Sequence, residues 1–210
     1  MATDYGREPV IVMPPMSTAA IEEVGLAVLR ELYPEALERP MALDVLHLVD
    51  QVLPQYGIHV YPADPAELQQ EEGLTNPAGD GEIEILIREE YWTNLALGGR
   101  RANRAKATVL HELGHAVLHV PVIRRRRVHP NAELLLRRVP AGAIKPFRNP
   151  EWQAWTFAGS VAMPRTTLKM LDDLSPEAVA ETYQVSEDFA RGHLRRLKLL
   201  ENKSALAARR

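Results

Sequence analysis

The residues most capable of chemistry lie close together near the middle of the chain, where His111, Glu112 and His115 share one short segment. His111 and His115 are four residues apart, so on a helix both imidazoles lie on one face and can reach one metal ion. Glu112 lies on the adjacent flank, where its carboxylate can accept a proton from a water at that ion without being a ligand. The spacing therefore predicts a zinc site, with Glu112 as the catalytic general base.

The alternative is an ordinary helix whose histidines and glutamate are exposed or hydrogen-bonded within the core. The apolar neighbours Val109, Val117 and Leu118 predict that this helix is largely buried. Unpaired buried polar groups cost about 1–3 kcal/mol each, so the side chains need partners, and a shared ion would provide one. The chain has no cysteine, so disulfides and thiolate ligands are excluded and any metal must be held by nitrogen and oxygen.

His119 is not expected to be the third ligand. It lies eight residues after His111 (119 − 111), which is about 12 Å along a helix axis. A straight helix cannot bring His111, His115 and His119 to one ion. We expect His119 to contact a ligand or to pack in the core.

The third ligand is expected to come from a separate helix, and Glu151 is the best candidate. It lies 36 residues after His115 (151 − 115) and follows Asn149 and Pro150, a strong helix start with Asn as the N-cap. Ala154 and Ala158 on the same face would allow close approach to the helix that carries the histidines. The alternative is that Glu151 only favours the helix N-terminus electrostatically.

Periodicity and start signals also predict the elements that must position these residues. Helices are expected at residues 17–33, from Pro40 to about Pro54, at 101–120 and at 149–162, with further helix starts at Ser175 and Ser186. Two β-branched segments, residues 57–62 and 83–88, predict paired strands, and residues 63–81 between them are expected to form a loop. Pro121 is expected to end the helix that carries the histidines.

Residues 121–148 are predicted to be a Pro- and Arg-rich excursion with one short helix at about residues 132–138. Residues 124–148 contain eight basic side chains, four of them at Arg124–Arg127, against one acidic side chain. They could dock an acidic partner or a phosphate, or gate the site, or form a solvated loop, which the chain's net charge of −3 favours.

Composition gives no sign of a membrane protein or of a general nucleic-acid binder. The chain is 46% hydrophobic and 25% charged, and no run approaches the roughly 20 apolar residues of a membrane span. The first twelve residues carry charges where a signal peptide would need an apolar run. We therefore expect a cytoplasmic protein.

Three stretches resemble the ImmA/IrrE family of metallo-endopeptidases: residues 107–119, residues 151–164, and residues 179–186 followed by 195–197. The second is similar to that family's Glu…Ala…Phe-Ala…Met-Pro segment, and its Glu-x-x-Ala start resembles the glutamate-bearing helix of the gluzincins. Gln153 departs from the pattern, because many members carry a second acidic residue there. The resemblance covers roughly residues 43–200.

The resemblance implies a zinc peptidase that cuts a repressor or antirepressor protein and thereby regulates transcription. The predicted fold is α+β and mostly helical: a flexible lead at residues 1–16, a zincin-like metallopeptidase domain at 17–165 and a helical extension at 166–210. The extension resembles a helix-turn-helix, although packing on the core is favoured over DNA binding. A regulator that binds DNA or protein through a non-catalytic core, or a zinc hydrolase acting on other bonds, remains the alternative.

Overall fold

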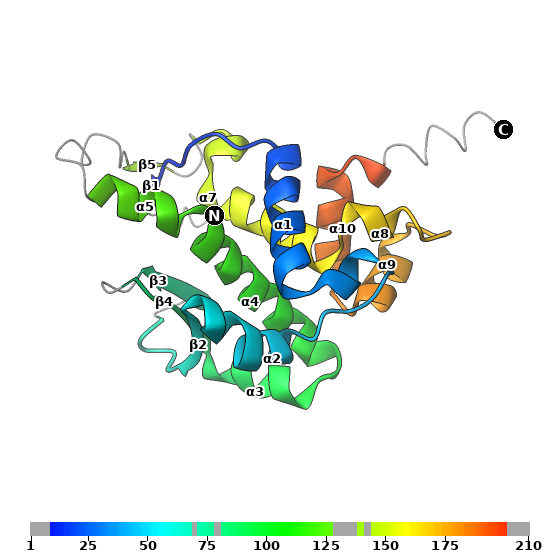
Figure 1. Ribbon diagram of the computed structural model, residues 1–210, viewed down its shortest axis with the longest axis horizontal. Helices are drawn as coiled ribbons and strands as arrows, with labels where there is room; N and C mark the ends of the chain where they lie inside the picture. Colours follow the sequence, from blue (N-terminus) through cyan, green and yellow to red (C-terminus); the bar gives the residue numbers. More distant parts are fainter. Residues whose placement is uncertain (1–8, 69–70, 78–80, 128–137, 141–143, 201–210) are drawn as a thin grey trace, which may run out of the picture.

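The computed structural model describes residues 9–68, 71–77, 81–127, 138–140 and 144–200. They form the predicted α+β, mostly helical fold (Figure 1). The α-helices are α1 (Thr18–Leu32), α2 (Val45–His47), α3 (Glu89–Leu97), α4 (Gly99–Leu118), α5 (Val120–Arg127), α7 (Pro150–Ala162), α8 (Arg165–Leu168), α9 (Pro176–Tyr183) and α10 (Glu187–Arg196). The strands are β1 (Pro9–Ile11), β2 (Ile58–Ala63), β3 (Gly73–Pro77), β4 (Ile83–Arg88) and β5 (Arg138–Pro140).

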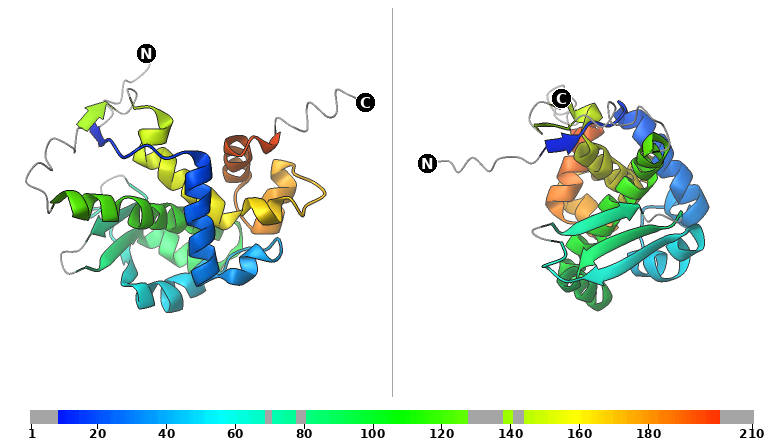
Figure 2. Two further views of the ribbon diagram at one scale, coloured as in Figure 1. Left: turned by 45° about the horizontal axis from the view of Figure 1, so that its top comes forward. Right: turned by 90° about the vertical axis from the view of Figure 1, so that its left-hand side faces the viewer.

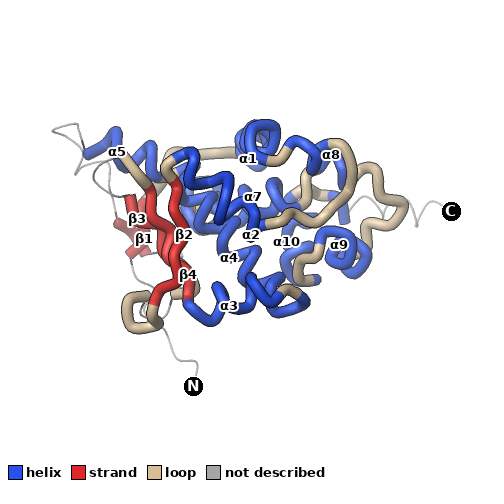
Figure 3. The backbone as a smooth tube through the Cα atoms, turned by 60° about the horizontal axis from the view of Figure 1, so that its bottom comes forward, coloured by secondary structure: helices blue, strands red, loops and turns tan. Residues whose placement is uncertain are grey.

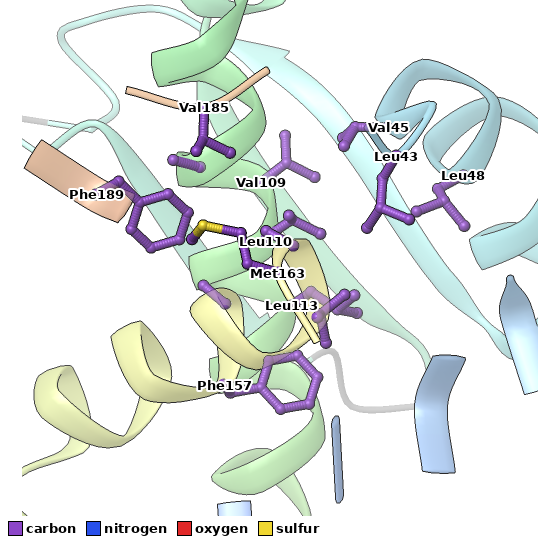
Figure 4. Close-up of a cluster of buried hydrophobic side chains, with 14 of the residues drawn as sticks. Leu43, Val45, Leu48, Val109, Leu110, Leu113, Phe157, Met163, Val185 and Phe189 are labelled. Carbon is purple, nitrogen blue, oxygen red and sulfur yellow. The ribbon is translucent and has the colours of Figure 1, made fainter. Parts of the chain in front are cut away.

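Helices α4 and α7 pack on each other through the middle of the molecule (Figure 1). Small residues allow this approach: a Cβ added to Gly114 would lie 3.0 Å from the backbone of Ala154. Leu113 of α4 and Phe157 of α7 are buried beside this crossing (Figure 4). α1 packs against α7 as well, so α7 is covered by helices from both halves of the chain.

A three-stranded sheet lies across the helices, with most helices on one side of it (Figures 2 and 3). Its strand order is β2-β4-β3, and β4 is parallel to β2 and antiparallel to β3. Ile85 and Ile87 are buried, whereas the alternating Glu84 and Leu86 are partly exposed. The predicted pairing of the two β-branched segments is confirmed.

The prediction of a loop at residues 63–81 is wrong at β3. This strand contains Gly73, Asn76 and Pro77, and its sequence lacks the apolar alternation that marks a strand. β3 pairs with β4 on one side only, as an edge strand, and proline is tolerated in such strands because one side needs no ladder hydrogen bonds.

Four predicted helix starts are confirmed by their N-caps. Ser17, Asn149, Ser175 and Ser186 each accept hydrogen bonds from the first turn of α1, α7, α9 and α10, respectively. The helix expected after Pro40 is instead split into α2, a π-helical turn at Leu48–Val52 and a 3₁₀ turn at Leu53–Tyr56. Helix α3 was not predicted.

The helix that carries the histidines ends close to the predicted residue 120, but Pro121 does not end the helical region. α4 ends at Leu118, and α5 begins at Val120 with Pro121 in its first turn. Proline is accepted there because the first helical N–H groups have no partner within the helix. The short helix predicted at 132–138 lies outside the described residues, except that Arg138 belongs to β5.

Part of the lead expected at residues 1–16 forms strand β1, which pairs antiparallel with β5. After β1, the N–H of Met13 donates to the carbonyl of Arg148 and that of Met16 to the carbonyl of Phe147. Residues 13–16 therefore lie against the chain that leads into α7. Among the described residues, no helix is long and apolar enough to cross a membrane.

Candidate metal centre

The three predicted ligands come together where α4 crosses the start of α7. Nε2 of His111 lies 3.1 Å from Oε2 of Glu151 and 3.1 Å from Nε2 of His115, whose Nε2 lies 3.4 Å from Oε1 of Glu151. In the described part of the chain, this is the group of ligand atoms that could hold a metal ion. The Glu151 side chain is 55% exposed, so the group can be reached from solvent.

The charges at this point attract a cation. Burial disfavours the ionised form of Glu151, but its bonds with His111 and His115 outweigh burial and hold the pKa of this carboxyl well below its usual range. Burial also opposes protonation of His115, yet Glu151 and the charge of Glu112 raise the pKa of this imidazole. A divalent cation between the same atoms would be stabilised by the same field. Two nitrogens and a carboxylate also match the donors that zinc accepts.

A chain of hydrogen bonds extends from His115 into the core. Nδ1 of His115 lies 3.0 Å from Nδ1 of His119, and Nε2 of His119 lies 2.9 Å from Oε1 of Gln153. Nε2 of Gln153 donates to the carbonyls of Pro14 and Phe147, both at 2.9 Å. His119 therefore contacts His115, one of the three predicted ligands, as expected.

The direction of these bonds sets the tautomer of His115. The Gln153 amide donates to two carbonyls, so its Oε1 must accept a hydrogen from Nε2 of His119. Burial lowers the pKa of His119 to about 4, so the ring is neutral and its Nδ1 accepts. Nδ1 of His115 must then donate, so in the neutral ring the lone pair lies on Nε2, the nitrogen that could bind a metal. Metal-ligating histidines are commonly held in this way.

His111 lacks such support. Its Nδ1 is buried and has no hydrogen-bond partner among the described residues. Apart from the contacts of its Nε2 within the cluster, this imidazole is held by packing, with its ring centroid 4.3 Å from that of Trp155. The two histidines of the site are therefore positioned by different means.

Glu112 is buried beside the cluster and is held by the edge strand β3. The Thr75 hydroxyl lies 2.7 Å from Oε2 of Glu112 and 3.0 Å from its backbone carbonyl. A Cβ added to Gly73 would lie 2.8 Å from Cγ of Glu112, so only glycine leaves room there. Sequence reasoning missed Thr75 and Gly73 because β3 was not recognised as a strand.

Some basic side chains outside the site form hydrogen bonds or ion pairs within the fold. Arg124 of α5 donates to the backbone carbonyls of Gly81 and Glu82. These hydrogen bonds connect α5 to the chain before β4. Residues 128–137 and 141–143 of the basic segment lie outside the described residues. In α10, Arg191 pairs with Glu177 and Glu187.

The C-terminal helices pack on the core. α10 buries Phe189, Ala190, His193 and Leu194 and contacts α7 and α9. With Arg191 paired to acidic side chains, these contacts favour packing over a face that reads DNA.

Comparisons with protein-family models, with curated proteins and with solved structures found no match to this chain. The resemblance noted in the sequence therefore stays a prediction.

Proposed function

We propose that this chain is a zinc-dependent endopeptidase with a zincin-like core. His111, His115 and Glu151 would hold the zinc, and Glu112 would be the general base. One observation carries the proposal. Four side chains from α4 and α7 supply two imidazole nitrogens, one carboxylate facing both, and a second carboxylate that is buried beside them but outside the cluster.

Bound zinc would supply a Lewis acid that polarises the scissile carbonyl and lowers the pKa of a water. Glu112 would take the proton of that water and later pass it to the leaving amine. Thr75 fixes Oε2 of Glu112, which leaves Oε1 to accept the proton. His119 and Gln153 would keep Nε2 of His115 unprotonated.

The position of β3 supports a peptide as substrate. β3 is an edge strand of its sheet, and its residue Thr75 contacts Glu112. An extended peptide can add to a sheet edge through main-chain hydrogen bonds, and here it would lie beside the base. Following the family resemblance, we propose that the natural substrate is a repressor-type protein and that cleavage regulates transcription.

The test compares zinc-loaded wild type with Glu112→Gln on a whole-cell lysate, with new N-termini counted by mass spectrometry. Glu112→Gln should keep its zinc and lose about 10²–10⁴-fold in cleavage rate, as expected for loss of a general base. Glu23→Gln, an exposed glutamate of α1, is the matched control and should cleave like wild type.

Equal cleavage by wild type and Glu112→Gln, or no new N-termini with zinc-loaded wild type, would contradict the proposal. A Glu112→Gln variant that is fully active in cells would instead favour a DNA- or protein-binding regulator.

A further inference from the structure

A cavity of about 190 Å³ opens beside His115. Its walls come from five parts of the chain: the segment after β1, the end of β3, the end of α4, α5 and the first residue of α7. The apolar lining is Met13, Pro77, Val120, Ile123 and Pro150. No Asp, Glu, Lys or Arg is among the described residues that line it.

The polar side chains of the lining are already engaged. Both ring nitrogens of His119 are bonded, to His115 and Gln153. His115 uses Nδ1 for His119 and turns Nε2 towards Glu151. The Thr75 hydroxyl donates to Glu112. A polar or charged occupant would therefore lose its hydrogen bonds with water and gain none from the cavity. An apolar occupant has no such bonds to lose.

The size of the cavity matches one side chain. An apolar cavity of about 150 Å³ is enough to bind benzene. We propose that this cavity binds an apolar side chain of the substrate, from a residue next to the scissile bond, and that Met13 determines which side chains fit. This inference rests on the proposed peptidase function, because His115 is both a wall of the cavity and a proposed ligand.

Met13 is a fixed part of this wall. Its side chain is 3% exposed, and its N–H donates to the carbonyl of Arg148 at 3.1 Å. The next residue, Pro14, accepts from Gln153 at 2.9 Å. The amide of Gln153 therefore anchors the wall and, through His119, also orients His115. The N-terminal segment is in this way joined to the metal centre.

The experiment measures binding and does not depend on cleavage. Zinc-loaded protein is titrated calorimetrically with three metal chelators. Acetohydroxamate has no amino-acid side chain, and the hydroxamates of N-acetyl-leucine and N-acetyl-aspartate each carry one. The leucine probe should bind about 10–100-fold more tightly than acetohydroxamate, the gain expected from burying one leucine side chain. The aspartate probe should gain nothing.

Variants then locate the effect. Met13→Asp should reduce the leucine gain to less than about threefold, because a charge in an apolar wall opposes burial. Met13→Leu should retain the gain. Ile123→Asp places a charge in the same cavity from a different element, α5, and should reduce the leucine gain to the same extent. Agreement between the two variants would show that the loss does not come from a folding defect of the N-terminal segment. Met170→Asp is the matched control, since Met170 is 55% exposed and does not line the cavity.

Equal affinity for the leucine probe and acetohydroxamate in wild type would overturn the cavity's role. An unchanged leucine gain in Met13→Asp would overturn the role of Met13. No binding of acetohydroxamate itself would instead overturn the proposed metal centre, and the cavity would then have no metal beside it.

Discussion

Two buried histidines lie at opposite ends of α7, and only one of them belongs to the candidate site. His119 contacts Gln153 near the start of α7, and His193 of α10 contacts Met163 just after its end. They are 2% and 0% exposed, respectively. Burial lowers the pKa of both, to about 4 for His119 and to about 3 for His193. By burial and pKa alone, the two residues are equivalent.

Their partners differ. His119 is bonded at both nitrogens, within a chain that ends on His115. His193 is bonded at Nε2, to the carbonyl of Met163, while its Nδ1 has no partner among the described residues. Its ring lies against Gly159, where no Cβ would fit. A lowered pKa therefore reports burial, whereas the hydrogen-bond partners separate a residue that positions a proposed ligand from one that packs two helices together.

The largest effect is expected from filling the space beside His193. A Cβ at position 159 would lie 2.3 Å from Nδ1 of His193, so Gly159→Ala should lower the free energy of unfolding by about 1–3 kcal/mol or more. Urea denaturation measures the change. Gly159→Ala combined with His193→Ala should be less destabilised than the sum of the two single variants. Additive losses would show that the contact is not tight.

The next effect separates the two histidines by metal affinity. His119→Leu removes the acceptor for Nδ1 of His115, and we expect the zinc dissociation constant to rise about 10–100-fold, as for other residues that support a ligand. His193→Leu should leave the zinc affinity unchanged. Competition with a chromophoric chelator measures both. Equal affinity in the two variants would remove the distinction between the two ends of α7.

The smallest effect concerns pH. His193 has a pKa of about 3 in the folded chain and about 6.5 when unfolded, so the unfolded state binds more protons between these values. The stability that depends on neutral His193 is present above about pH 6.5 and is lost as pH falls towards the folded pKa. From about pH 7.5 to 5.5, wild type should lose about 1 kcal/mol more than His193→Leu. Parallel curves would contradict this.

Sequence alone could predict much of the candidate site because its proposed ligands follow local rules. The spacing of His111 and His115 fixes one helix face, and Asn149 with Pro150 marks the helix start that carries Glu151. These patterns depend on a few adjacent residues. The caps of α1, α9 and α10 were predictable for the same reason.

The rest depends on tertiary contacts. Nothing near Thr75 in the sequence indicates that β4 pairs with it, yet that pairing brings Thr75 to Glu112. In the sequence, Gln153 was noticed only because it replaces an acidic residue of the family pattern. Its structural role could not be predicted, because it depends on contacts with His119 and with the carbonyl of Pro14. The wall formed by Met13 likewise depends on where the N-terminal segment lies.

The most direct test of the central claim is the zinc content of the purified protein by elemental mass spectrometry, with Glu151→Ala and Glu177→Ala alongside. Glu177 follows Ser175 and Pro176 at the start of α9 and controls for the general effect of a glutamate in the first turn. We predict about one zinc per chain in wild type and in Glu177→Ala, and little in Glu151→Ala. Wild type without zinc after zinc is supplied, or full zinc in Glu151→Ala, would contradict the three-ligand centre.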